Sequence, residues 1–158
     1  MDDTILTIKT LMVEVSTRIM SLSPEEQEIR PAQGKWSKKE ILGHLVDSAI
    51  NNLKRFTEIQ FMPRPYTVIK YKQAELVTAN NYQGTQTDQI IHLWLSLNQQ
   101  ILNVIALQTA ESLAYPVILP DGNTSDLRFL IEDYAEHMEH HARQIKAWKS
   151  GDGRDQLK

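Results

Sequence analysis

The segment DYAEHMEHHARQI, residues 133–145, is the stretch around which the rest of the sequence is best interpreted. It carries three of the chain's five histidines, and His137 and His141 are four residues apart. On an α-helix this spacing puts both side chains on one face, one turn apart, where two imidazoles can close on one metal ion. Met138 and Glu139 follow His137, so the glutamate of the HExxH metalloprotease motif is not in its usual place and that chemistry is disfavoured.

The residues around the two histidines indicate that they face inward. Apolar side chains continue the same steps of three and four along the segment, at Leu127, Leu130, Tyr134, Ile145 and Trp148. His140 falls off this stripe and is expected either to be exposed or to support a ligand from outside the site. The pattern predicts a helix that is capped by Thr124 or Ser125, runs to about Lys149 and ends at Gly151.

Three further amphipathic helices precede this one. The first carries apolar residues in alternating steps of three and four, at Ile5, Ile8, Met12, Val15, Ile19 and Leu22. The second begins at a capping box made by Ser37 and Glu40 and runs to about Gln60. The third begins near Thr87 or Asp88, either of which could cap it.

The connections between these helices are unequal. Residues 61–86 form a long connection that is expected to include a short helix near 73–80, and such a length is typical of a crossover or of a functional segment. Residues 112–123 predict a brief hairpin. Four long helices with little strand content predict an all-α four-helix bundle in one domain, residues 1–158. The long second connection favours up-down-down-up order, with simple up-and-down order as the alternative.

Composition excludes several classes of function. The formal net charge is −3 and no basic block is present, which disfavours nucleic-acid binding. No apolar run approaches the roughly 18 residues that span a bilayer, so no membrane partner is expected. The chain has no cysteine, which excludes disulfides, thiolate metal ligands and a cysteine nucleophile. Because the N-terminus shows no signal-peptide pattern, a cytoplasmic protein is expected.

The second helix supplies the remaining candidates. His44, Ser48, Asn51 and Arg55 form a polar stripe along one edge of its inner face. Three-histidine sites that leave a position for water are typical of catalytic zinc, so His44 is the natural third ligand. Ser48, Asn51 and Arg55 are candidate walls of a pocket for an anionic or polar substrate, or alternatively a hydrogen-bonded seam between helices.

These two segments together resemble the DinB/YfiT-like superfamily of metal-dependent enzymes. The segment WSKKEILGHLVD matches the family pattern at Trp36, Ser37, Glu40, His44, Leu45 and Asp47, and the second match is at His137, His141, Gln144 and Ile145. The resemblance implies a four-helix bundle with up-down-down-up order and a divalent metal, zinc or nickel, on the three histidines. It also implies a homodimer and a small-molecule substrate, including in some relatives a low-molecular-weight thiol used for S-transfer or isomerisation.

Several alternatives stay open at this point. The three histidines could be hydrogen-bonded core residues, or the protein could be a non-catalytic, stress-related binding module with a structural metal or none. Asp47 is a candidate general base or an acceptor for a ligand imidazole, against a solvated carboxylate. Tyr134 could shape a pocket or simply pack in the core. A di-metal carboxylate site is disfavoured, because Glu136 and Glu139 lack the required inward spacing.

Overall fold

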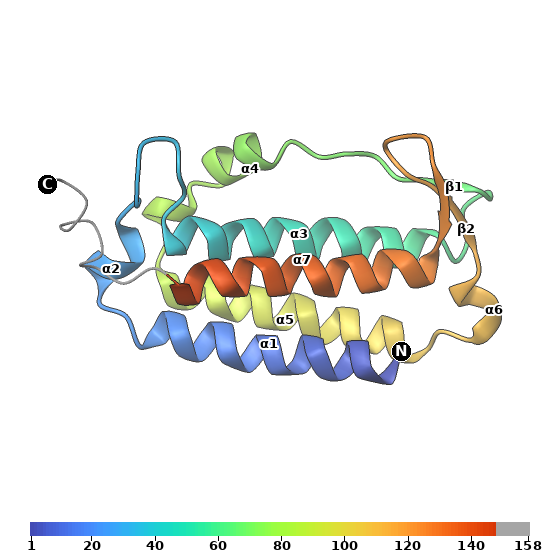
Figure 1. The fold of residues 1–158 in the computed structure, drawn as a ribbon, viewed down its shortest axis with the longest axis horizontal. Helices are drawn as coiled ribbons and strands as arrows, with labels where there is room; N and C mark the ends of the chain where they lie inside the picture. The colour runs from blue at the N-terminus through green and yellow to red at the C-terminus, as the bar shows by residue number, and fades with distance from the viewer. Residues whose placement is uncertain (148–158) are drawn as a thin grey trace, which may run out of the picture.

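Four long helices make up most of the computed structural model, which describes residues 1–147 (Figure 1). They are α1 (Asp2–Met20), α3 (Lys38–Glu58), α5 (Thr87–Ala106) and α7 (Leu127–Ala147). Figure 1 shows that α3 and α5 run in one direction and that α1 and α7 run in the other. The predicted up-down-down-up order is therefore confirmed. Trp148, Lys149 and Gly151, where the last helix was expected to end, lie outside the described residues.

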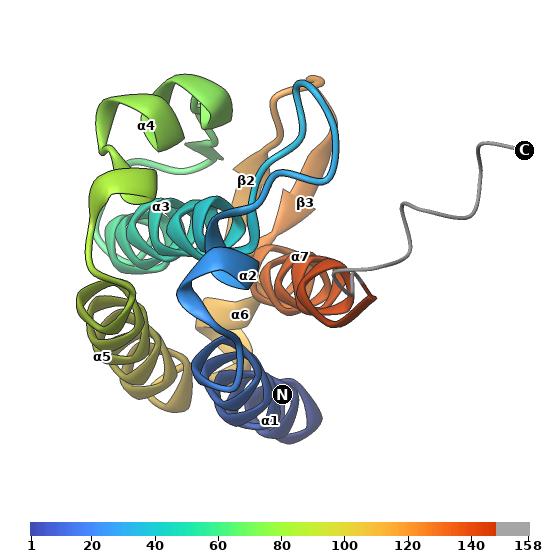
Figure 2. The same cartoon turned by 90° about the vertical axis from the view of Figure 1, so that its left-hand side faces the viewer.

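Short helices fill the connections. α2 (Pro24–Glu28) follows α1, and α6 (Ala110–Leu113) follows α5. The crossover between α3 and α5 passes back along the outer side of α3 and carries α4 (Gln73–Ala79) and the 3-10 turn η1 (Tyr82–Gly84) (Figure 2). The predicted short helix in this connection is thus confirmed, and it lies outside the four-helix core.

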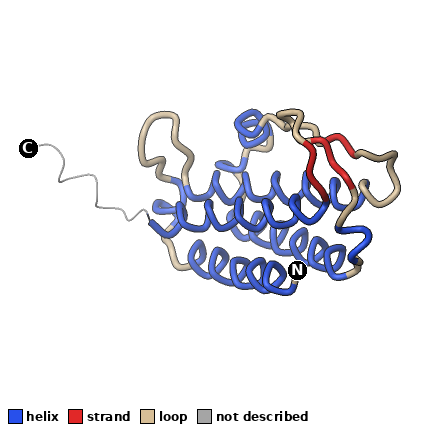
Figure 3. The backbone as a smooth tube through the Cα atoms, turned by 45° about the vertical axis from the view of Figure 1, so that its right-hand side comes forward, coloured by secondary structure: helices blue, strands red, loops and turns tan. Residues whose placement is uncertain are grey.

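A small sheet closes one end of the bundle (Figure 3). β2 (Pro116–Ile118) and β3 (Thr124–Asp126) form the predicted hairpin, with Val117 opposite Ser125. β1 (Tyr66–Thr67) adds to β2 in parallel, a pairing that the sequence did not predict. Because β1 belongs to the crossover, the sheet holds the first part of that connection beside the hairpin and over α3.

The apolar stripes of the helices meet in one core. Each long helix contributes fully buried side chains, among them Ile8, Ile19, Leu42, Leu45, Phe56, Trp94, Ile101, Leu127 and Ile145. Gly43 lets the crossover approach α3 closely, since a Cβ built on it would lie 2.2 Å from the ring of Tyr82. No helix within residues 1–147 is both long enough and apolar enough to cross a bilayer.

Two predicted helix caps are wrong. Thr124 and Ser125 belong to β3, and Asp126 takes the capping role by accepting a hydrogen bond at 2.9 Å from the backbone N–H of Phe129. At α5 the N-cap position is Gln86, which makes no side-chain cap. Both differences result from tertiary contacts. Pairing between β2 and β3 extends to Asp126, the residue before α7, and the hydroxyl of Thr87 donates to the side chain of Gln27 on α2 instead of capping α5.

Candidate metal centre

Three imidazoles meet between α3 and α7. His44 comes from the second turn of α3, while His137 and His141 come from successive turns of α7. The Nε2 atom of His137 lies 3.1 Å from Nε2 of His44 and 3.2 Å from Nε2 of His141. One ligand nitrogen from each residue falls within 4.8 Å of the others. We call these residues the histidine triad.

The spacing of the triad fits a shared cation. Imidazole nitrogens bound to one tetrahedral zinc at 2.0–2.1 Å lie roughly 3.3 Å apart. The two closest Nε2 pairs, at 3.1 and 3.2 Å, are near this value without any rearrangement. Three nitrogen donors are also a set that zinc and nickel accept. The residues present therefore fit a divalent ion.

The rings are held in the neutral form that a metal ligand needs. Burial, with the neighbouring rings of His141 and His137, lowers the pKa of His44 to about 3. Burial and the ring of His137 lower the pKa of His141 to about 4. Burial also lowers the pKa of His137, and the nearby His140 adds to that effect. All three rings are thus neutral at pH 7, with lone pairs available.

Hydrogen bonds on the outer nitrogens set the direction of those lone pairs. Nδ1 of His141 is 2.8 Å from Oε1 of Gln144, an oxygen that can only accept, so the proton resides on Nδ1. Nδ1 of His137 is 3.3 Å from the hydroxyl oxygen of Ser48. A hydroxyl can donate or accept, so Ser48 is compatible with either tautomer of His137. In the tautomer with the proton on Nδ1, the Nε2 atoms of His137 and His141 both present lone pairs to the space between the rings, which is the arrangement that a shared cation requires.

His44 has a different environment. It is completely buried, and its ring packs against that of Trp36 with centroids 5.0 Å apart. Its Nδ1 atom is buried with no hydrogen-bond partner among the described residues. The indole therefore fixes this ring by packing, where Ser48 and Gln144 fix the other two by hydrogen bonds.

Asp47 points away from the triad. Its Oδ1 atom accepts hydrogen bonds from the hydroxyl of Tyr82 at 2.7 Å and from the side-chain amide of Asn80 at 2.8 Å. Burial raises the pKa of this carboxyl group. No ring nitrogen of the triad is among its partners in the described chain. Its contacts join α3 to the crossover, and they lend no support to the predicted role as acceptor for a ligand imidazole.

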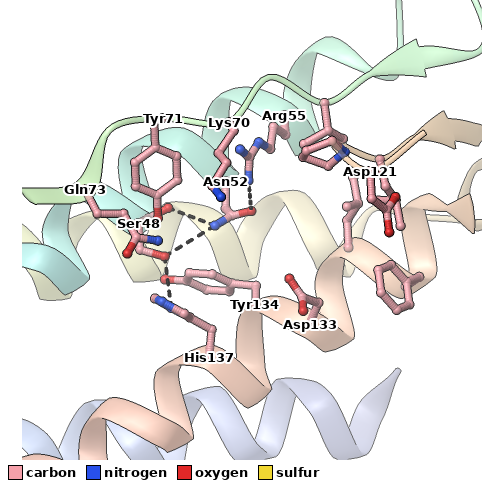
Figure 4. A pocket seen from close by; sticks show the side chains of 15 residues that line it. Ser48, Asn52, Arg55, Lys70, Tyr71, Gln73, Asp121, Asp133, Tyr134 and His137 are labelled. Atoms are coloured by element: carbon pink, nitrogen blue, oxygen red, sulfur yellow. Dashed lines mark hydrogen bonds between the residues drawn. The ribbon is translucent and has the colours of Figure 1, made fainter. Parts of the chain in front are cut away.

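A cavity of about 390 Å³ opens beside His137 (Figure 4). Of the residues predicted to line a pocket, Ser48, Arg55 and Tyr134 do so. Asn51 does not, because its side chain turns back to the carbonyl of Asp47. Tyr134 contributes only its ring, since its hydroxyl donates to Asn98 on α5 at 2.7 Å inside the core.

Several other residues that line this cavity were not predicted from the sequence. Asn52 on α3 and Asp133 on α7 line the cavity, together with Lys70, Tyr71 and Gln73 of the crossover. The only signal for the crossover residues was the unusual length of that connection. A second hollow, about 660 Å³, lies on the other side of the triad between Trp36, Ile41, His141 and Gln144. The two remaining histidines, His92 and His140, are exposed.

Comparison with known proteins identifies the family of this chain and shows that other proteins share its fold. The profile of the DinB superfamily matches residues 13–145. The structure is similar to that of YfiT from Bacillus subtilis, described as a probable metal-dependent hydrolase with an unusual four-helix bundle topology. That similarity has a TM-score of 0.84 at 16% identity, over 92% of this chain and 83% of the other. No curated protein matches the sequence.

A second similar structure is the mycothiol-dependent maleylpyruvate isomerase. Its TM-score is 0.73 at 11% identity, over 92% of this chain and 60% of the isomerase. A mutant of that isomerase matches equally, with a TM-score of 0.73 at 11% identity over 94% of this chain and 62% of the other. At these identities the similarity establishes the four-helix fold, and the chain spans only part of the isomerase.

Proposed function

Because this chain belongs to the DinB superfamily, we propose that it is a metal-dependent enzyme whose histidine triad holds one divalent ion, zinc or nickel, and acts on a small molecule. The observation that carries the proposal is the convergence of three neutral imidazoles at 3.1 and 3.2 Å between Nε2 atoms. A ring nitrogen carries either one proton or one lone pair, so the Nε2 atom of His137 can form a linear hydrogen bond with only one of the two nitrogens that approach it. A hydrogen-bonded core cluster therefore leaves one of these close contacts unexplained, whereas one shared cation accounts for both.

Different residues of the chain would bind the ion, orient its ligands and enclose the substrate. An ion held by three neutral ligands keeps its full charge, and it supplies a Lewis acid that lowers the pKa of a water or a thiol toward neutrality. Gln144 holds His141 in the ligating tautomer, and Ser48 can accept a hydrogen bond from Nδ1 of His137 when that ring adopts the same tautomer. The cavity beside His137 supplies room for a substrate, and Tyr134 forms an apolar part of its wall.

Two reaction types fit this arrangement. The first is hydrolysis, as described for YfiT, and the second is transfer or isomerisation that uses a low-molecular-weight thiol, as in the mycothiol-dependent isomerase. Both need a nucleophile of lowered pKa and a second molecule in the cavity. The alternative, a binding module with a structural metal, is less well supported because structural zinc sites are closed by a fourth protein ligand. Within residues 1–147 the cluster offers only three ligands; His137 lines one cavity and His141 lines the hollow beside Trp36.

Metal content tests the proposal directly. Protein purified without chelators or affinity tags that leach metal should contain close to one equivalent of transition metal by elemental analysis. His137→Ala should lose it while keeping its helical circular dichroism, because His137 lies at the edge of the core. The exposed His92 provides a matched control, so His92→Ala should keep the metal. Less than about a tenth of an equivalent, with no thermal shift on adding Zn²⁺ or Ni²⁺, would refute the metal site.

A further inference from the structure

The cavity beside His137 contains a cationic wall that the proposed function does not explain. Four charged side chains line it: Arg55 of α3 and Lys70 of the crossover are cationic, and Asp121 and Asp133 are acidic. Neither Arg55 nor Lys70 forms an ion pair among the described residues. We propose that Arg55 and Lys70 form a subsite for a carboxylate group, so that the substrate is a small organic acid whose reacting end faces the histidine triad. This inference rests on the proposed function and names the substrate class of that site.

Arg55 is held in place without being neutralised. One terminal nitrogen donates to the carbonyl of Ile69 at 2.8 Å, and the other donates to Oδ1 of Asn52 at 3.3 Å. Both acceptors are uncharged, so the guanidinium is oriented while its positive charge remains available. A fixed guanidinium with free donors is the preferred protein partner of a carboxylate, because two parallel hydrogen bonds match the geometry of the two oxygens.

The crossover completes the subsite. Lys70 and Tyr71 project from it toward the same cavity, across from the α7 wall that bears Asp133 and His137 (Figure 4). The guanidinium of Arg55 lies 5.6 Å from the centre of the Tyr71 ring, which fixes it further. The long connection therefore brings a second cation to the wall formed by α3. This placement accounts for a segment whose length is otherwise unusual in a compact bundle.

The subsite is linked to the metal centre through α3. Asn52, which orients Arg55, also donates to the hydroxyl oxygen of Ser48 at 3.4 Å, and Ser48 in turn contacts Nδ1 of His137. Arg55 comes seven residues after Ser48, or roughly 10 Å along the helix, but its side chain turns back by about one turn toward Asn52. The carboxylate and the reacting atom of a bound substrate should therefore be roughly 6–10 Å apart.

Asp133 provides a control in which the affinity for a carboxylate should change in the opposite direction. Its carboxyl group lines the same cavity, and burial raises its pKa while the charge of Arg55 acts in the opposite direction. A bound carboxylate would meet this like charge on the opposite wall. Removing the charge with Asp133→Asn should therefore tighten carboxylate binding, whereas removing Arg55 should weaken it. A cavity that merely admits polar molecules would not respond with opposite signs.

The test uses thiols that differ only in one charged group. We suggest isothermal titration of the zinc-loaded protein with 3-mercaptopropionate, 4-mercaptobutyrate and 6-mercaptohexanoate, each compared with its own amide. For the acid that spans the site, the Kd should be at least tenfold lower than for its amide. Arg55→Gln and the exposed Lys70→Gln should reduce that ratio, and Asp133→Asn should raise it. Arg128→Gln removes the same unit charge from an exposed position outside the cavity and should leave it unchanged.

Failure of the subsite and failure of the metal site give different results. The same acids and amides are titrated into metal-free protein, where binding is weaker but the preference for the acid persists because Arg55 and Lys70 do not depend on the ion. If zinc does not bind but this preference is present, the metal proposal fails and the subsite stands. Equal affinity for acid and amide in both forms, or an equal ratio in Arg55→Gln and Arg128→Gln, overturns the carboxylate subsite.

Discussion

Substitution of Gly43 by alanine tests how the crossover is attached to the helix that carries the metal centre. Gly43 precedes His44, and a Cβ at this position would lie 2.2 Å from two ring atoms of Tyr82 and 2.7 Å from its Cβ. Carbon atoms in contact are about 3.5–4.0 Å apart, so the base of a nearly buried side chain would have to move by at least about 1 Å. The ring cannot escape by rotating its tip, because the clash is near the backbone.

The expected cost can be worked from the contacts that this movement breaks. Overpacking of this kind costs about 1–3 kcal/mol. Displacing Tyr82 also removes its 2.7 Å hydrogen bond to the buried carboxylate of Asp47, and a bond to a charged group contributes about 1.5–3 kcal/mol. Alanine regains about 1 kcal/mol over glycine inside a helix. The net loss of unfolding free energy for Gly43→Ala should therefore be about 3 kcal/mol.

Urea unfolding followed by circular dichroism measures this loss, and a double-mutant cycle identifies its cause. In a Tyr82→Ala background the obstructing ring is absent, so Gly43→Ala should become neutral or slightly stabilising. Tyr82→Phe should lose only the hydrogen-bond part. The reasoning is refuted if Gly43→Ala leaves the wild-type stability unchanged, or if it costs the same with and without Tyr82.

Three further outcomes are expected. The metal-free protein should lose stability as the pH falls from about 6.5 toward 4, because the unfolded histidines take up protons near 6.5 while two triad histidines keep folded pKa values of about 3 and about 4. Urea unfolding at pH 7, 6 and 5 checks this, and an unfolding free energy that does not change over this range would contradict it. Ser48→Ala removes the partner of Nδ1 of His137 and should weaken zinc binding by about tenfold in a chelator competition, with helicity retained. Asp126→Ala removes the cap of α7 and should cost about 1 kcal/mol, or about 2–4 °C in Tm, whereas Ser125→Ala, at a position that makes no cap, should change Tm by less.

Much of the fold could be predicted from local patterns. The apolar steps of three and four located all four long helices, and Ser37 with Glu40 marked the start of α3, where both capping hydrogen bonds are present. The errors fell where a residue's role depends on a distant partner. Thr124 and Ser125 have good capping chemistry but pair with β2 instead. The parallel pairing of β1 joins segments about 50 residues apart, and no local pattern encodes it.

For the site, the sequence alone determined which imidazoles share a face and which helix could supply the third. Helical periodicity places His137 above His141, and the inward stripe of the second helix singles out His44, because side-chain direction on a helix follows from spacing. Only the tertiary structure decided that the three Nε2 atoms meet, that Asn52 and not Asn51 faces the cavity, and that Asp47 turns toward Tyr82. Lys70 and Tyr71 gain their place from the path of the crossover over α3, and such a path depends on contacts across the whole chain rather than on the residues within it.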